Sequence, residues 1–350
     1  MDPRVLEDKS RASIVVQYRV AASRVYWCWF RRINWENVMR IRNRCMWMIA
    51  ALVGTLGLGM TPVVAQQNPG KPVVNNRPST EIPASITADL DVVYASYGKR
   101  QLHLDLFRSK DAKQPMPTLV VVHGGGWLKG DKAKFRALAL QLARLGYVTA
   151  AIEYRLGGEA LFPAAIYDCN AAVRFLRANA DKYHIDPQRI GAVGGSAGGH
   201  LVGLMATAPH IKEFQGSGGN SQQSSQLQAA VVLAGPLELA TGSVAEKSRK
   251  DPKNSNANKW FGKTIDQDPA LYRLASPFTH VNKRTPPMLF MAGEFDYPER
   301  NQGTRDKLKA LGIETGIIVV KEGKHGCWNR EPWFSSMVHA MDKFFRRSLK

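Results

Sequence analysis

Cysteine and acidic residues are both scarce in this chain of 350 residues. It holds four cysteines, with no pair at the short spacing of a zinc site. This excludes a disulfide-dense scaffold and provides no cysteine zinc site. Acidic residues number 29 against 48 lysines and arginines, so the formal net charge is +19. Apolar residues make up 44% and charged residues 22%, which is ordinary for a globular protein and excludes a wholly disordered chain.

The first 65 residues are predicted to be a leader and not part of the fold. Residues 1–44 carry ten basic and four acidic side chains, whereas residues 45–65 carry no charge and end in a proline break and Ala65. A basic stretch, a short apolar stretch and a small residue at the cleavage point are typical of a secretory signal. Val63 and Ala65 suit the −3 and −1 positions. We therefore expect cleavage after Ala65 and export to the periplasm or the medium.

Two alternatives remain for this leader. Residues 1–38 exceed the usual length of a signal's basic region, so translation starting at Met39 is one hypothesis and a genuine extended N-terminus is the other. Residues 45–65 are long enough for a permanent transmembrane anchor only if most of them lie in lipid, and their glycines and proline favour a cleavable signal. The mature form would then have no stable membrane span. It would keep Cys169 and Cys327, either as one disulfide or as two separate thiols.

The charge of the mature part indicates which partners to expect. Residues 1–44 account for +6, and +13 remains after the uncharged segment. Lysines and arginines are spread along the chain and form no basic cluster interleaved with aromatic residues, so no nucleic-acid partner is predicted. The basic surface is either simply solvated or attracts an acidic polysaccharide outside the cell.

From Asp89 onwards the sequence alternates between strand and helix patterns, after a linker at residues 66–88. This predicts one domain over residues 89–350, with a mostly parallel sheet flanked by helices on both faces. Residues 216–228 are expected to be a mobile surface loop, and residues 236–285 an insertion between two strands. The predicted strands are 91–94, 102–107, 118–122, 147–152, 190–193, 229–233, 288–291 and 317–320, and the predicted helices are 134–145, 164–180, 199–207, 300–311 and 333–346.

The strongest chemical signal is Gly194-x-Ser196-x-Gly198 between a strand and a helix. A nucleophilic serine needs a tight strand-to-helix turn, where side chains larger than those of glycine or alanine would collide. The following helix directs its N-terminal N–H groups towards developing negative charge. A phosphate-binding loop looks similar, but no Gly-Lys-Ser/Thr follows here. Ser196 is therefore the predicted nucleophile.

A second glycine loop, His123-Gly124-Gly125-Gly126-Trp127, follows the predicted strand at 118–122. Consecutive glycines let backbone N–H groups approach a substrate oxygen, which is the character of an oxyanion hole. His123 is expected to be a structural residue at the root of the loop. Trp127 either lines the substrate pocket or covers the loop.

A nucleophilic serine also needs a base and an acid that orients it. His325 follows the last predicted strand and Asp296 follows the strand at 288–291, both at the edge of the sheet where Ser196 lies. Glu294 is the nearest rival acid. Asp168, inside a helix, is expected to be structural, and His200 is expected to point away from Ser196.

Together these motifs resemble the α/β-hydrolase superfamily, and more narrowly secreted microbial carbohydrate esterases of the acetyl-xylan and feruloyl esterase type. The resemblance covers about residues 89–348. It implies Ser196, Asp296 and His325 as the catalytic triad, and an oxyanion hole of the Ala197, Gly124 and Gly125 N–H groups. It implies a small cap over residues 236–285 and no metal or organic cofactor. Its one departure is Tyr297-Pro298-Glu299 after the acid, in place of a small residue, Val and Pro.

The expected reaction is two-step acyl transfer from an ester, with short acyl or feruloyl esters of carbohydrate as the first choice of substrate. The substrate would be a small molecule or a polysaccharide ester. An amidase or formamidase uses similar loops and stays an alternative. A binding module of the same fold without catalysis is the alternative outside the enzymes.

Overall fold

The computed structural model describes residues 76–350 of the chain. The predictions of a signal ending at Ala65 and of a start at Met39 lie outside the described residues. Within the described part the first strand begins at Ile86, close to the predicted start of the domain at Asp89. None of the helices in residues 76–350 has the length and apolar character needed to cross a membrane.

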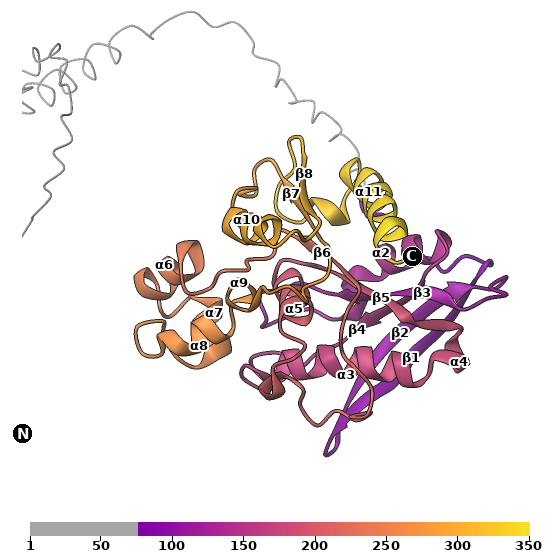
Figure 1. Cartoon of the computed structure of the whole chain (residues 1–350), viewed down its shortest axis with the longest axis horizontal. Helices are drawn as coiled ribbons and strands as arrows, with labels where there is room; N and C mark the ends of the chain where they lie inside the picture. The colour runs from indigo at the N-terminus through magenta and orange to yellow at the C-terminus, as the bar shows by residue number, and fades with distance from the viewer. Residues whose placement is uncertain (1–75) are drawn as a thin grey trace, which may run out of the picture. The chain divides into compact units, whose positions relative to one another are not determined.

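Eight strands form one mixed sheet (Figure 1). They are β1 (Ile86–Tyr97), β2 (Arg100–Ser109), β3 (Met116–Val122), β4 (Val148–Ile152), β5 (Ile185–Gly195), β6 (Ala229–Leu233), β7 (Met288–Gly293) and β8 (Thr315–Val320). Their order is β1-β2-β4-β3-β5-β6-β7-β8. The pairs β1–β2 and β2–β4 are antiparallel, and all other neighbours are parallel. The predicted mostly parallel sheet is confirmed.

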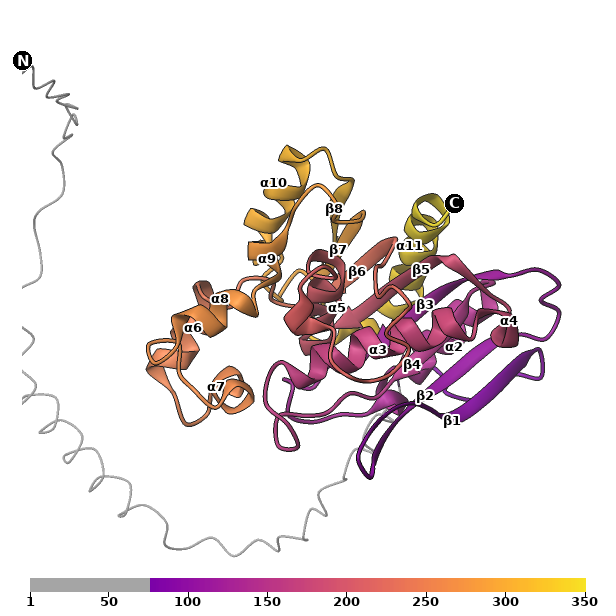
Figure 2. The same ribbon diagram turned by 60° about the horizontal axis from the view of Figure 1, so that its bottom comes forward.

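Helices cover both faces of this sheet (Figure 2). They are α2 (Arg136–Arg144), α3 (Ala164–Ala178), α4 (Ala180–Tyr183), α5 (Ala197–Thr207), α6 (Gly242–Lys250), α7 (Asn256–Phe261), α8 (Pro269–Leu274), α9 (Pro277–His280), α10 (Gln302–Ala310) and α11 (Trp333–Ser348), with 3-10 turns η1 (Lys132–Phe135), η2 (Lys212–Phe214) and η3 (Cys327–Asn329). Helices α3 and α5 pack on one face, and α2 and α11 on the other.

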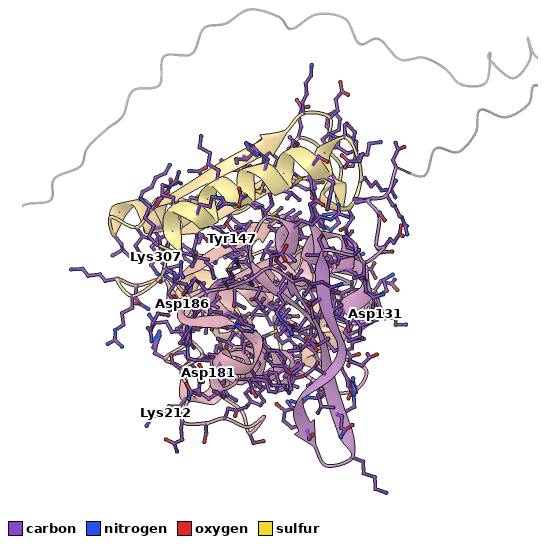
Figure 3. All side chains as sticks on the ribbon, turned by 90° about the vertical axis from the view of Figure 1, so that its right-hand side faces the viewer. Asp131, Tyr147, Asp181, Asp186, Lys212 and Lys307 are labelled. Atoms are coloured by element: carbon purple, nitrogen blue, oxygen red, sulfur yellow. The ribbon has the colours of Figure 1, made fainter. Side chains whose placement is uncertain are left out.

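The central strands bury side chains on both faces. In β3, Val120 and Val122 pack into the layer under α3 and α5, whereas Leu119 and Val121 pack into the layer under α2 and α11. Successive side chains of a strand point to opposite faces, so a run of apolar residues suits a strand covered on both sides. A hydrogen bond links a strand-side residue to α11 at the edge of the layer under α2 and α11. The Tyr147 hydroxyl donates to Asp342 Oδ1 of α11 at 3.0 Å, and Figure 3 shows Tyr147 beside that helix.

Two predicted helices are shorter than expected, and in each a side chain bonds to the backbone near the end that differs. The helix predicted at 134–145 begins as the 3-10 turn η1, where Asp131 accepts from Ala133 N at 2.9 Å. The helix predicted at 164–180 ends at Ala178, since the Asn179 amide donates to the Phe175 carbonyl at 2.8 Å. Short polar side chains compete with helix continuation in this way.

Residues 236–285 contain α6 to α9 and no strand, and they connect β6 to β7. Their interior is held by buried polar contacts. Both Ser248 Oγ and the Tyr272 hydroxyl donate to Asn258 Oδ1, each at 2.5 Å. Beside them Trp260 is completely buried. The short helices α6 to α9 therefore form a packed helical insertion between β6 and β7.

The glycine- and serine-rich segment at 216–228 is a surface loop tied to α3. Arg174 Nε donates to the Gly219 carbonyl and Arg177 Nη2 to the Gln226 carbonyl, each at 3.0 Å. Its mobility stays a prediction.

The two cysteines of the described part are both buried and free. Cys169 lies in α3 within the apolar layer on one face of the sheet, and Cys327 lies in the layer on the other face. The alternative of one disulfide is therefore wrong, because the sheet separates the two sulfur atoms.

Candidate active site

Ser196 stands on a sharp turn between β5 and α5. Its backbone has φ 57° and ψ −121°, a conformation that costs energy for any residue with a Cβ. Its N–H donates to the Leu233 carbonyl of β6 at 2.8 Å, and its carbonyl accepts from His200 N of α5 at 3.0 Å. These two bonds hold the turn in place from both sides.

The glycines around Ser196 are required by close backbone contacts. A Cβ on Gly194 would lie 2.4 Å from the Gly198 carbonyl oxygen, and a Cβ on Gly198 would lie 2.2 Å from the Val122 carbonyl oxygen. Both distances are far below van der Waals contact. The glycine motif thus lets the turn pack against itself and against the end of β3.

The structure brings the three predicted catalytic side chains together. His325 Nε2 lies 3.0 Å from Ser196 Oγ, and His325 Nδ1 lies 2.7 Å from Asp296 Oδ2. The Asp296 residue is 5% exposed, whereas the His325 side chain is 51% exposed. The aspartate can therefore accept from Nδ1–H, which leaves Nε2 unprotonated and able to accept the serine proton.

Two loops after neighbouring strands bring Asp296 to His325. Phe295 N donates to the Gly323 carbonyl at 2.9 Å, and a Cβ on Gly293 would lie 2.2 Å from the same oxygen. The loops after β7 and β8 therefore contact each other backbone to backbone. The ring of Trp328 then meets the His325 imidazole edge to face, with centroids 5.1 Å apart.

Glu294 and Asp168, the two other acidic residues considered in the sequence analysis, have partners outside the triad. Glu294 Oε2 accepts from Glu322 N at 2.8 Å, so this rival acid braces the loop and does not contact His325. Asp168 is buried and pairs with Arg155 at 2.8 Å. Desolvation raises the pKa of Asp168 although Arg155 opposes the shift. Asp168 thus has the structural position expected of it, away from the triad.

The predicted oxyanion groups lie next to Ser196. A Cβ on Gly124 would be 3.1 Å from the Ser196 Cβ, so the loop touches the serine turn. Gly125 has φ +146°, which a residue with a side chain rarely adopts. Within residues 76–350, the N–H groups of Gly124, Gly125 and Ala197 donate to no acceptor. Three backbone donors thus remain available beside the hydroxyl.

A cavity of about 390 Å³ opens at these groups. Besides the glycines, Ser196 and His325, its lining includes side chains that the sequence analysis did not single out: Lys129, Lys134, Phe135, Asn256, Trp328 and Asn329. Lys129 and Lys134 follow the glycine loop closely enough to have been suspected. Asn256 comes from the insertion, and no pattern in the sequence predicts where the insertion folds.

Trp127 anchors the glycine loop. It is 6% exposed, and its indole stacks on Trp260 with centroids 5.0 Å apart. Its Nε1–H donates to His200 Nδ1 at 3.2 Å, and His200 Nε2 lies 2.7 Å from the Ala275 carbonyl oxygen. Trp127 is not part of the lining of the Ser196 cavity but faces the hollow beside it. Trp127 thus covers the loop, one of its two predicted roles, and lining the substrate pocket, the other, stays a prediction.

Both buried histidines near the site are structural in position. His123 stacks on Tyr154 with centroids 4.3 Å apart, and the His200 ring makes the two contacts just described and no hydrogen bond to the Ser196 side chain. Burial lowers the pKa of each imidazole to about 4. For His200 the partners agree, because Nδ1 must be unprotonated to accept from the indole.

The described residues offer no group of three or more His, Cys, Asp or Glu side chains arranged to hold a metal ion.

Replacing Gly198 with alanine should destabilise the protein. The added Cβ would meet backbone oxygens of Val122 and His123 at 2.2 and 2.5 Å, and backbone cannot move aside cheaply. Overpacking of this kind costs about 1–3 kcal/mol. We expect Gly198→Ala to lower the urea midpoint accordingly. Gly158→Ala is the matched control, since its Cβ would have nothing within 4 Å. Equal midpoints for the two variants would contradict the packing argument.

Stability should fall as the pH is lowered from about 6.5 to 5. The folded-state pKa of His123 and His200 is about 4, below the ordinary 6.5, so the unfolded chain binds more protons in this range. The free energy of unfolding should drop with decreasing pH, by at most roughly 3 kcal/mol per histidine at pH 4. Urea unfolding between pH 7 and 5 measures the slope, with the exposed His339→Gln as a control that keeps it. A flat profile would count against neutral buried imidazoles.

Known proteins resemble this chain in sequence. The BD-FAE family model matches residues 104–303, more than half of the chain. Esterase LipC of Mycobacterium tuberculosis is 32% identical over 229 residues, covering 64% of this chain and 56% of LipC. The probable carboxylic ester hydrolase LipM of the same organism is 30% identical over 221 residues, covering 59% of this chain and 48% of LipM. The chain thus spans about half the length of these curated relatives.

Solved structures agree with the sequence comparison. A truncated carbohydrate esterase from gut microbiota superposes with a TM-score of 0.66 and 26% identity, covering 78% of this chain and 99% of that one. Thermophilic esterase Est2 of Thermogutta terrifontis, with propionate bound, gives 0.63 and 25%, covering 74% of this chain and 94% of that one. The predicted α/β-hydrolase fold is confirmed, and the chain belongs to the BD-FAE family.

Proposed function

We propose that this protein is a serine-dependent hydrolase of carboxylic esters. The observation that carries the proposal is the chain of contacts from Ser196 Oγ to His325 Nε2 at 3.0 Å and from His325 Nδ1 to Asp296 Oδ2 at 2.7 Å. The free N–H groups of the glycine loop lie beside the Ser196 hydroxyl in the lining of the catalytic cavity. The names of LipC, LipM and Est2 as esterases or ester hydrolases support the same reaction.

The first step acylates the serine. As Ser196 Oγ attacks the ester carbonyl carbon, its proton moves to His325 Nε2. Asp296 keeps the imidazole oriented and stabilises the imidazolium that forms. The tetrahedral intermediate collapses when Nε2 returns the proton to the leaving alkoxide, and an alcohol departs. Water then attacks the acyl carbonyl, gives its proton to Nε2, and the carboxylic acid leaves as Ser196 regains its proton.

The backbone donors act on the oxygen that becomes negative. We assign the oxyanion hole to the N–H groups of Ala197, Gly124 and Gly125. Ala197 begins α5, so its N–H also adds the positive end of a helix dipole. Loss of one such donor costs about 2.7–4 kcal/mol of transition-state stabilisation.

The finer proposal is that the alcohol part is a carbohydrate, with a short acyl or feruloyl group as the acid part. The catalytic cavity shares Asn256 with a neighbouring hollow of about 250 Å³, and this hollow shares Ser243 with a third of about 290 Å³. Asparagine, serine and threonine side chains line this path together with the charged side chains of Lys247, Glu238, Glu299 and Arg300. Tyr297 at its far end is 67% exposed. Amides, hydroxyls and an exposed aromatic ring suit a sugar chain.

Ser196→Ala should remove ester hydrolysis and leave the fold intact. We expect kcat/KM for 4-nitrophenyl acetate to fall by about 10³-fold or more, because the nucleophile is absent. The exposed Ser217→Ala should retain the activity of the unmodified protein. Covalent labelling by a fluorophosphonate should occur in the Ser217 variant and be lost in the Ser196 variant. Turnover near the unmodified rate in Ser196→Ala would end the proposal.

We further propose export and cleavage after Ala65. The net charge of +13 on the remaining chain supports attraction to acidic polysaccharide outside the cell. Intact mass of the protein recovered from its own cells should match a chain that begins at Gln66. A mass that includes residues 1–38 would refute both cleavage and the start at Met39.

A further inference from the structure

Two lysines stand at the catalytic cavity without an acidic neighbour in its lining. Lys129 and Lys134 are exposed and line the same cavity as Ser196 and His325. Among the described residues that line it, none is an aspartate or a glutamate, and the remaining polar side chains are the amides of Asn256 and Asn329. The lining of the cavity therefore carries two lysine side chains and no carboxylate.

Neither lysine is neutralised by an ion pair within the described residues. Their neighbour Lys132 shows the contrast, since its Nζ lies 2.7 Å from Asp91 Oδ1 and 3.1 Å from Asp105 Oδ1. Lys134 Nζ instead donates to the Gly124 carbonyl at 3.3 Å. Asp131 is the nearby acid, and one of its oxygens caps η1 by accepting from Ala133 N at 2.9 Å.

The backbone fixes both lysines next to the oxyanion loop. Lys129 N donates to the Gly125 carbonyl at 3.2 Å, so the chain folds back on the glycines. Lys134 sits in η1, and its ammonium reaches Gly124. Partial desolvation at the cavity wall lowers the pKa of Lys134 although the residue is exposed, and the charge of Lys129 lowers it further while Asp131 opposes the shift. Both ammonium groups belong to the lining of one cavity, so an anion bound there would reduce the repulsion between them.

We infer that Lys129 and Lys134 form a subsite for a carboxylate carried by the ester substrate. This inference rests on the ester hydrolase proposed above and specifies its substrate class. Ammonium groups bind carboxylates through charge-assisted hydrogen bonds. The carboxylate belongs either to the alcohol part, as in an ester on a uronic acid, or to the acyl part, as in the half-ester of a dicarboxylic acid.

The experiment compares matched esters that differ in one charge. For the alcohol part, 4-acetoxybenzoate is compared with methyl 4-acetoxybenzoate. For the acyl part, mono-4-nitrophenyl adipate is compared with methyl 4-nitrophenyl adipate. The readout is the ratio of kcat/KM for the anionic ester to that for the neutral ester, each normalised to hydrolysis by hydroxide. The arm with the larger ratio identifies which part of the substrate carries the carboxylate.

Replacing the lysines should lower this ratio. We expect a fall of about threefold for Lys129→Gln and about tenfold for the double variant with Lys134→Gln, as for exposed ion pairs. Lys129→Glu should lower it further. In the unmodified protein the ratio should also shrink at 1 M salt, where the Debye length falls to about 3 Å. Lys113→Gln is the matched control, because this exposed lysine precedes β3 at the strand end opposite the glycine loop.

Three outcomes would overturn the inference. The first is that the double variant hydrolyses both the anionic and the neutral ester at the rates of the unmodified protein, so that neither the rates nor their ratio changes. The second is an equal fall of the anionic and neutral rates, which would mean that the lysines act only on the oxyanion. The third is an effect of Lys113→Gln as large as that of Lys129→Gln. Hydrolysis of the neutral esters through Ser196 would still stand in each of these cases. If no ester at all is hydrolysed and Ser196 resists labelling, the ester hydrolase itself is refuted.

Discussion

The backbone contact between the serine turn and the end of β3 is the constraint on which the site depends. The carbonyl oxygens of Val122 and His123 lie where a side chain at position 198 would begin. That contact seats the N-terminus of α5 on the strand that leads into the oxyanion loop. It therefore sets Ser196, the proposed nucleophile, and the N–H groups of two different segments at a fixed separation. Preorganised donors of this kind need no rearrangement as charge develops.

A second constraint acts on the base and the acid. Asp296 is buried, and an ionised carboxylate in that position needs hydrogen-bonding partners. His325 Nδ1 provides one at 2.7 Å, and Arg300 Nη2 approaches its other oxygen at 3.9 Å. The glycine contact between residues 293 and 323 holds the two loops that carry this pair. The imidazole is thus oriented from behind, while its other nitrogen faces the serine and the open cavity.

The sequence predicted those parts of the site that local geometry dictates. Only glycines allow the backbone contacts at 194 and 198. The glycine motif therefore predicts the strand-to-helix turn and the position of Ser196 on it. The order of strands then places Asp296 and His325 at the same edge, since parallel strands end together. The fate of Cys169 and Cys327 could not be read in this way, because it depends on which face of the sheet each residue meets. The helix ends at Asp131 and Asn179 were not predicted for a related reason. A capping hydrogen bond can be identified only when the positions of both its donor and its acceptor are known.

The contacts that the insertion at residues 236–285 makes with the site could not be predicted from sequence patterns. Its contribution reaches the site through Asn256 in the cavity wall and through Trp260, which supports Trp127. Trp127 Nε1–H and the Ala275 carbonyl hold the two nitrogens of His200, one turn of α5 beyond the nucleophile. The insertion, the oxyanion loop and the nucleophile helix therefore share one buried hydrogen-bonded unit. Because Nδ1 accepts and Nε2–H donates, only the neutral imidazole fits both partners at once. A segment with no motif of its own thus bears on the geometry of the glycine loop through a single buried ring.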